Sequence, residues 1–377
     1  MKIGILTYFG DCNPGTVLQS YSLFKHIKQL YENRASVEVI NYHSFKRYDR
    51  PYLSSVSPKS LYKDFIRIKK YREFNKSCYP LSQPYIRTTD FELAKSYIDR
   101  QGYDLIYVGS DTLLELHRVK DGVTIFWLPP EIKAFKIFIA ASARNTEYDG
   151  LSEKQKKQME LCLYDVGFIG VRDLATKRLI ESFKLNKSVS LIPDPTFALD
   201  IDTSYAERYM KRMGLSRKNK LICIHLTRSF KWGREFASIA REYGYRVVSL
   251  RPCYYADYVF NDLSPLEYSG IFRYFDSVIT HRFHDTVYAL KNLTPVITAV
   301  PDQSYTNRYG ESKQFSLLKD FGMEETNFIP YPLEGSAQLI HQKATDSIKS
   351  FDRRKVKLQL NRNRDIFLSY LTDTRLE

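Results

Sequence analysis

A short segment with two imidazoles and one guanidinium is the part of this chain best suited to chemistry. It runs from Thr280 to Asp285 and reads Thr-His-Arg-Phe-His-Asp. A guanidinium binds a carboxylate or a phosphate through two parallel hydrogen bonds, and an imidazole exchanges a proton near neutral pH. The segment therefore predicts an anionic substrate and a proton to be moved. A polar turn that caps the following helix is the alternative interpretation.

The neighbouring sequence favours a functional role for this segment. It follows the apolar, strand-like run Ser277-Val278-Ile279 and precedes a helical pattern from Thr286 to Asn292. Open α/β sheets bind their ligands where strands end and helices begin. Two histidines three residues apart could also hold a metal on a helix. Because Asp285 is the only further ligand nearby and no cysteine joins them, we predict neither a metal nor a cofactor.

Other strand-like runs also end in polar side chains. Ser110 and Asp111 follow the run from Leu105, Arg172 follows the run ending at Val171, and Asp194 and His225 end two more. Carboxyl ends of parallel strands share one edge of a sheet, so these groups are expected to line a binding edge. A helix N-cap would equally explain Asp111, and a satisfied core histidine would equally explain His225.

The loop after the first strand is a candidate ligand loop. It reads Gly-Asp-Cys-Asn-Pro-Gly-Thr-Val-Leu-Gln from Gly10 to Gln19. A glycine loop at a helix N-terminus presents backbone N–H groups to a ligand, which suggests a role for Asn13, Gly15 and Gln19. Neither the dinucleotide fingerprint nor the P-loop pattern is present, and Gly-x-Ser-x-Gly of serine hydrolases is also absent. A plain turn and helix cap remains the alternative.

Short apolar runs alternate with longer helical patterns, which predicts an α/β protein with parallel sheets. The first series has strands expected at Ile3–Tyr8, Val37–Asn41, Leu105–Gly109, Phe135–Ala141, Gly167–Val171 and Val189–Ile192. The second series has strands expected at Leu221–Leu226, Arg246–Leu250, Val278–Thr280 and Val296–Val300. Helices are expected at Leu18–Tyr31, Arg234–Tyr243, Pro265–Tyr274 and Arg353–Leu371.

Two such series predict two Rossmann-like domains, which a chain of 377 residues can supply. We place the first domain at 1–205, the second at 215–345 and a basic C-terminal helix at 346–377. That last helix either crosses back to the first domain or binds nucleic acid. A Tyr-rich basic insertion at about 44–100 carries an amphipathic helix around Leu61 to Phe74. This helix is either an ordinary surface helix or one that rests on an anionic membrane or a phosphorylated acceptor.

The composition fits a soluble globular protein that meets anions. The formal net charge is +14, which attracts phosphorylated substrates, acidic lipids or nucleic acid. Without a dense basic low-complexity run, no nucleic-acid tail is expected. Five widely spaced cysteines predict reduced thiols. The absence of a signal-peptide pattern or a long apolar stretch predicts a cytoplasmic protein, with peripheral contact at the inner face of the membrane left open.

The ordered motifs resemble the polysaccharide pyruvyl transferase family. The segment from Asn13 to Leu23 is similar to the family's Asn-Tyr-Gly-x-x-Leu-Gln-x-Tyr-Ala-Leu, and the block from Phe275 to His284 is the most specific match. Smaller matching pieces are Val108-Gly-Ser-Asp111, Ala140-Ala-Ser142, Val171-Arg-Asp173, Asp194-Pro-Thr-Phe197, Ser264-Pro-Leu-Glu-Tyr268 and Thr294-Pro-Val-Ile297. The resemblance implies a GT-B-like fold of two Rossmann-like domains that face each other across a cleft.

The resemblance also implies transfer of pyruvate from phosphoenolpyruvate, as co-substrate, to a sugar as a cyclic ketal. The family's Arg-x-His motif corresponds to Arg282-Phe283-His284, and its Val-Arg-Asp/Glu arginine corresponds to Arg172. We accordingly expect these roles: catalysis by His284, Asp285 and Asp111; donor binding by Arg282, Arg172, Phe283 and His281; acceptor binding by Asn13, Gly15, Gln19, Ser110 and His225.

Three departures from the family pattern leave the acceptor open. Asp285 stands in place of Gly, Pro14 replaces an aromatic residue, and Thr112 stands where Gln is common. The acceptor is a polymer, a lipid-linked unit or a nucleotide sugar, and the oligomeric state is not predicted. Two alternatives remain: a GT-B glycosyltransferase with a nucleotide-sugar donor, and a non-enzymatic protein that binds nucleic acid or membranes.

Overall fold

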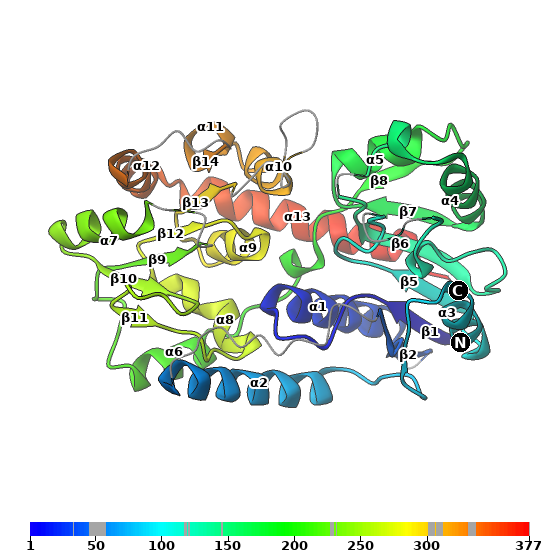
Figure 1. Ribbon diagram of the computed structural model, residues 1–377, viewed down its shortest axis with the longest axis horizontal. Coiled ribbons are helices and arrows are strands. Elements are labelled where there is room, and N and C mark those ends of the chain that lie inside the picture. The colour runs from blue at the N-terminus through cyan, green and yellow to red at the C-terminus, as the bar shows by residue number, and fades with distance from the viewer. Residues whose placement is uncertain are drawn as a thin grey trace. The chain divides into compact units, whose positions relative to one another are not determined.

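The computed structural model describes residues 1–376 apart from 33, 45–57, 117, 118, 120, 145, 227–229, 231, 301–305, 307–311 and 331–336. The chain divides into two compact α/β units (Figure 1). Unit 1 comprises Met1–Pro51, Glu73–Leu199 and Asn363–Glu377, and unit 2 comprises Tyr52–Arg72 and Asp200–Arg362.

Unit 1 is built on a six-stranded parallel sheet with the order β2-β1-β5-β6-β7-β8. Its strands are β1 (Lys2–Leu6), β2 (Ser36–Val39), β5 (Leu105–Val108), β6 (Phe135–Ala141), β7 (Phe168–Val171) and β8 (Val189–Leu191). Its helices include α1 (Pro14–Tyr31), α3 (Phe91–Arg100), α4 (Glu153–Asp165) and α5 (Leu174–Glu181), and a small second sheet pairs β3 (Tyr42–His43) with β4 (Ile86–Arg87). The strand order reverses between β1 and β5, and such a reversal is where open α/β sheets bind ligands.

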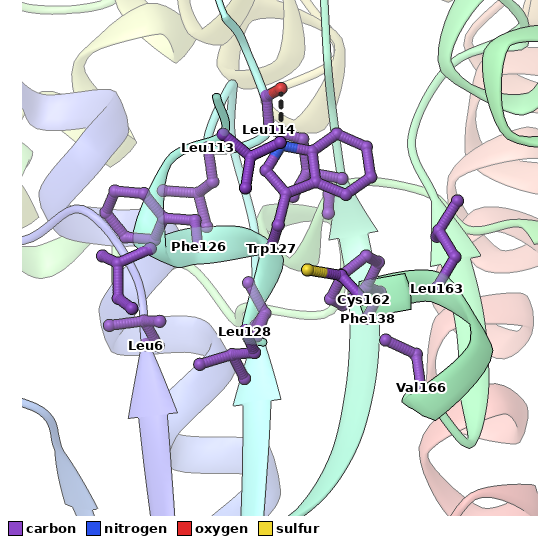
Figure 2. Close-up of a cluster of buried hydrophobic side chains, with 14 of the residues drawn as sticks. Leu6, Leu113, Leu114, Phe126, Trp127, Leu128, Phe138, Cys162, Leu163 and Val166 are labelled. Carbon is purple, nitrogen blue, oxygen red and sulfur yellow. Dashed lines mark hydrogen bonds between the residues drawn. The ribbon is translucent and has the colours of Figure 1, made fainter. Parts of the chain in front are cut away.

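The core of unit 1 explains why its sheet edge is firmly positioned. Figure 2 shows Trp127 among side chains from several elements, including Leu114, Phe138 and Leu163. The indole ring is fully buried, and its N–H donates to the carbonyl of Leu114 at 3.2 Å. Buried apolar surface of this kind is the main stabilising contribution to a fold. Val108 before this loop and Leu113 after it both belong to the cluster, so the loop that carries Asp111 is anchored at its two ends.

Unit 2 repeats the architecture with the strand order β11-β10-β9-β12-β13-β14, again parallel throughout. Its strands are β9 (Leu221–His225), β10 (Arg246–Ser249), β11 (Tyr258–Val259), β12 (Ser277–Thr280), β13 (Val296–Ala299) and β14 (Phe328–Ile329). Its helices are α6 (Ser204–Arg212), α7 (Gly233–Glu242), α8 (Pro265–Ile271), α9 (Phe283–Lys291), α10 (Lys313–Asp320), α11 (Glu324–Asn327) and α12 (Ala337–Ser350). The order reverses between β9 and β12, and α9 follows β12 and lies along β12 and β13 (Figure 1).

The ten strands expected from the sequence are all present, each within two residues of its predicted ends.

The insertion at about 44–100 is divided between the two units, which differs from the predicted domain boundary. Its helix α2 (Pro58–Cys78) belongs to unit 2 as far as Arg72, whereas we expected the whole of 1–205 to form one domain. The reason is polar docking: Lys70 Nζ lies 2.7 Å from Glu267, and Lys63 Nζ donates to the carbonyl of Val259 at 2.6 Å. Residues 45–57 of the insertion lie outside the described residues.

These contacts also bear on the interpretation of α2 as a membrane or acceptor helix. Lys63 and Lys70 are bound within unit 2, while Tyr62 and Phe65 are exposed. A peripheral membrane contact of the exposed face stays a prediction. In the parts of the chain that the structure describes, no helix is long and apolar enough to cross a membrane.

The last helix, α13 (Arg353–Asp373), contributes residues to both units. From Asn363 onward it belongs to unit 1, where Phe367 is fully buried and Tyr370 donates its hydroxyl to the carbonyl of Phe138 at 2.8 Å. The second unit therefore extends to Arg362, beyond the boundary at 345 expected from the sequence.

Candidate functional site

The carboxyl ends of β9 and β12 carry most of the predicted chemistry of unit 2. His225 ends β9 and Thr280 ends β12, and the two residues are register partners in the sheet. This pair of strands is the point where the strand order reverses. Arg282 then occupies the N-cap position of α9 in extended conformation, so the chain turns directly from strand to helix. The reversal places the segment of interest at the ligand edge of a parallel sheet.

Asp285 lies inside this edge, on the first turn of α9. Its carboxylate accepts the hydroxyl hydrogens of Tyr268 and, at 2.7 Å, of Thr280, and its Oδ2 lies 2.6 Å from Nδ1 of His225. Burial would raise the pKa of Asp285, but His225, the charge of Arg282 and the Tyr268 hydroxyl outweigh it and hold that pKa well below its usual range. Asp285 is thus a fully buried, deprotonated carboxylate.

This environment bears on the catalytic role expected for Asp285. Its carboxylate is 0% exposed, accepts two hydroxyl hydrogens and lies against Nδ1 of His225, which leaves a sugar hydroxyl little room to approach it. The imidazole beside it is that of His225. A direct exchange of the substrate proton by Asp285 stays a prediction.

His281 is a neutral imidazole in this structure. Its Nδ1 lies 3.0 Å from the carbonyl oxygen of His225, and its own carbonyl accepts from Nε2 of Gln314 at 2.8 Å. Burial, together with the charge of Arg282 and the neighbouring His225, lowers the pKa of His281 to about 3. At neutral pH the ring is therefore uncharged, and the expected donor contact of His281 stays a prediction.

Arg282 and His284 are the half-buried polar side chains of the segment. In the described residues the guanidinium of Arg282 has no carboxylate within ion-pair distance, while its backbone N–H donates to Thr280 Oγ1 at 3.0 Å. Phe283 is buried, stacks edge-on against His284 with ring centroids 5.2 Å apart, and receives Lys313 Nζ over its face. Phe283 therefore fixes the start of α9, and the donor contact expected for Arg282 stays a prediction.

Gln19 and Ser110 have a structural role at the corresponding edge of unit 1. The Gln19 side chain is fully buried; its Nε2 donates to Thr7 Oγ1 and to the carbonyl of Tyr8, both at 3.0 Å. Its Oε1 accepts from the backbone N–H and the hydroxyl of Ser110. Every hydrogen-bonding position of this amide is used to join the ends of β1 and β5. Contact of Gln19 or Ser110 with a sugar acceptor stays a prediction.

Arg172 is held by carboxylates at the same edge. Its Nη1 lies 2.9 Å from Asp194 and its Nη2 lies 3.4 Å from Asp111, and the guanidinium is almost completely buried. Burial would lower the pKa of Arg172, but Asp111, Asp194 and Asp173 outweigh it and raise that pKa. The expected donor contact of Arg172 and the expected catalytic role of Asp111 stay predictions, since both groups already pair with each other.

Asn13 and Gly15 form the start of α1. Asn13 is the N-cap: its Oδ1 accepts from the backbone N–H of Gly15 at 3.1 Å, and its own N–H donates to Asp11 at 3.0 Å. This is the turn and helix cap that the sequence left open as an alternative. Contact of either residue with a sugar acceptor stays a prediction.

Comparison with protein families identifies the chain. Residues 13–302 match the family described as polysaccharide pyruvyl transferase, which is more than half of the 377 residues. The chain belongs to the polysaccharide pyruvyl transferase family. The family suspected from the motifs is thereby confirmed, and so is the assignment of this pyruvyl transferase family member as a transferase. No curated protein matches the chain in sequence.

Solved structures similar to this family member share its fold. The UDP-GlcNAc 2-epimerase of Neisseria meningitidis bound to UDP-GlcNAc is 10% identical, with a TM-score of 0.53 over 98% of this chain and 100% of that chain. S. aureus MnaA bound to UDP is 12% identical, with a TM-score of 0.52 over 98% of this chain and 94% of that chain. At such low identity the similarity establishes only the fold, which is GT-B-like as the sequence predicted.

The sequence assigned no role to Tyr268 and Thr280 of unit 2, and it placed Asp194 at the edge of unit 1 without predicting that it pairs with Arg172. For Asp194 a signal was present, because opposite charges end two consecutive strands, β7 and β8, that are neighbours in the sheet. For Tyr268 the sequence offers none, since its contact with Asp285 depends on how α8 packs against α9. No cluster of three potential metal ligands occurs among the residues whose placement is described.

Proposed function

We propose that this protein transfers pyruvate from phosphoenolpyruvate to two hydroxyls of a sugar, forming a cyclic ketal. The observation that carries the proposal is Arg282, a half-buried guanidinium at the strand-order reversal of unit 2 without a carboxylate partner in the described residues. A buried or half-buried cation without a counter-ion favours binding of an anion. Phosphoenolpyruvate offers both a carboxylate and a phosphate to such a group.

The chemistry needs one acid and one base. His284, two residues after Arg282 on the first turn of α9, is the proposed acid that protonates the methylene carbon of phosphoenolpyruvate. The adjacent carbon becomes oxocarbenium-like and is attacked by a sugar hydroxyl, which loses its proton to a base. A second hydroxyl then attacks the same carbon as the bond to phosphate breaks. The two sugar hydroxyls release two hydrogens. One equals the hydrogen that the methylene carbon gained to become a methyl group, and the other leaves with the phosphate.

The proposal is tested by supplying purified protein with phosphoenolpyruvate and candidate acceptors. The acceptor series contains a polysaccharide, a lipid-linked sugar and a nucleotide sugar, and the readouts are phosphate release and a mass gain on the sugar. Equal amounts of released phosphate and modified sugar support pyruvyl transfer. Calorimetry with phosphoenolpyruvate and with uridine diphosphate separates the alternatives, because tight binding of the nucleotide alone would favour a nucleotide-sugar transferase.

Two variants connect the activity to the site. Arg282→Lys keeps the charge but loses the two-pronged geometry, so the KM for phosphoenolpyruvate should rise. His284→Gln should lower kcat by roughly 10²–10⁴-fold, the usual contribution of a positioned acid. Arg208→Lys on α6 and His341→Gln on α12 are the matched controls, since neither residue belongs to the segment that follows β12. Undiminished transfer by His284→Gln would remove that residue from the acid role.

A further inference from the structure

We propose that Asp285 holds the hydrogen of His225 on Nδ1, and that the lone pair left on Nε2 of His225 accepts the proton of the attacking sugar hydroxyl. His225 is then the base and Asp285 a positioning residue. The second half of this proposal rests on the proposed function, whereas the first half concerns a proton position that can be measured without any substrate.

The contacts of Asp285 determine where the shared proton lies. Two unprotonated acceptors 2.6 Å apart would repel each other, so the short ion-pair contact between Asp285 Oδ2 and His225 Nδ1 favours a hydrogen on one of the two groups. The Thr280 hydroxyl lies 2.7 Å from the same carboxylate oxygen and accepts the backbone N–H of Arg282 at 3.0 Å. Its single hydrogen has two acceptors in reach, Asp285 Oδ2 and the carbonyl of His225 at 3.3 Å, and the shorter contact favours Asp285. Together with the Tyr268 hydroxyl on Oδ1, it stabilises the carboxylate form and leaves the shared hydrogen on the histidine.

The state of His225 follows from this arrangement. The side chain is buried, and burial lowers its pKa although Asp285 opposes the shift. A neutral imidazole carries one hydrogen, and Nδ1 holds it, so Nε2 is an acceptor. The backbone of His225 is fixed as well, because its carbonyl oxygen lies 3.0 Å from Nδ1 of His281. Both the ring and the main chain of His225 are thus held in place before a substrate arrives.

The location of His225 suits a base for the proposed reaction. It ends β9 beside Thr280 of β12, and Arg282 is close enough to influence its ionisation. In the proposed step, Nε2 accepts the hydroxyl hydrogen while the oxygen forms a bond to the central carbon of the donor, and the negative charge of Asp285 stabilises the resulting imidazolium. This gives the buried carboxylate a function that direct proton exchange could not.

The first measurement is the tautomer of His225. Protein labelled with ¹⁵N-histidine contains seven histidines, and long-range proton–nitrogen correlation distinguishes Nδ1–H from Nε2–H. A His225→Gln spectrum identifies the signal. The expected result for the wild-type protein is Nδ1–H. In Asp285→Asn the amide hydrogen faces Nδ1, so the ring should change to Nε2–H. A wild-type His225 with its hydrogen on Nε2 would overturn the proposal, even if the variant fails to fold.

The second measurement is the reaction itself. Asp285→Asn should lower kcat by roughly 10²–10⁴-fold with little change in the KM for phosphoenolpyruvate. Tyr268→Phe, which removes a donor from Oδ1 but leaves the His225 contact, should retain the Nδ1–H tautomer and lose less activity. An unchanged kcat in Asp285→Asn would overturn the base role of His225. If the tautomer is as expected but no acceptor receives pyruvate, the proposed function fails while the Asp285–His225 arrangement stands.

Discussion

Nη1 of Arg172 lies 2.9 Å from Oδ2 of Asp194, and this buried ion pair joins the end of β7 to the turn that follows β8. Asp111, after β5, approaches the same guanidinium at 3.4 Å. The guanidinium of Arg172 therefore links the residues that follow three strands of unit 1, β5, β7 and β8. Because the carboxylates are also almost fully buried, the arrangement stabilises this edge only as long as all the charges are present.

Removing the cation should therefore destabilise the protein strongly. Arg172→Ala leaves Asp111 and Asp194 buried without their counter-ion, and we expect a loss of about 3–5 kcal/mol in the free energy of unfolding. Denaturant unfolding measures it. Lys154→Ala is the control, since Lys154 forms an exposed ion pair with Asp121 and should cost about 0–1 kcal/mol. If Arg172→Ala were as stable as the control but failed to bind phosphoenolpyruvate, Arg172 would be a donor-binding residue.

The Gln19 amide provides a second stability prediction. Gln19→Ala leaves the N–H of Ser110 and the carbonyl of Tyr8 without their buried partner, so unfolding should become easier by about 1–3 kcal/mol. Gln342→Ala on α12 is the control, because Gln342 is exposed and its hydrogen bond runs to Asp346 of its own helix. A Gln19→Ala variant of normal stability that no longer binds acceptor would restore the role predicted from the sequence.

Gly109 allows the close approach of β5 and β6 at the same edge. A Cβ at this position would lie 1.8 Å from the carbonyl oxygen of Ile139, a backbone atom that cannot move aside. Gly109→Ala should therefore cost roughly 3 kcal/mol or more and lower the yield of folded protein. Gly150→Ala, where nothing lies within 4 Å, should be close to neutral in the same thermal and denaturant unfolding experiments. Similar melting temperatures for the two variants would contradict the geometry of this strand pair.

Elements that depend on local sequence could be predicted well. The run Leu-Ile-Tyr-Val of β5 is short, apolar and followed by glycine, and the run Ser-Val-Ile-Thr of β12 ends at a polar segment. Such runs are recognisable because strands buried on both faces need continuous apolar sequence. Parallel pairing then brings the polar residues that follow them to one edge, which is why several candidate residues of each unit do lie together.

The roles of individual side chains could not be predicted in the same way. Whether Asp285 is a base or a fixed carboxylate depends on Tyr268, 17 residues earlier, and on His225, 60 residues earlier. Similarly, Gln19 looks like a ligand residue until Ser110 is seen to occupy its oxygen. Tertiary packing decides whether a side chain is buried and whether its hydrogen-bonding atoms already have partners. A sequence motif gives the residue types but neither of these properties.

The neutral state of His281 leads to a prediction for acid conditions. In the unfolded chain a histidine has an ordinary pKa of about 6.5, whereas in the folded protein the pKa of His281 is about 3. Between these values the unfolded state binds a proton that the folded state does not. The contribution of His281 to stability is therefore complete above about pH 6.5 and declines as the pH falls toward 3.

This decline can be isolated with one variant. His281→Asn retains a side-chain hydrogen-bond donor for the carbonyl of His225 but does not titrate. Between pH 7 and pH 4 the wild-type protein should lose on the order of 3 kcal/mol more unfolding free energy than the variant. His225 also has a lowered pKa, so both proteins lose stability in acid, and the difference between them reports His281. Parallel pH profiles for the two proteins would show that His281 titrates normally, which would return it to the group of cations available to an anionic donor.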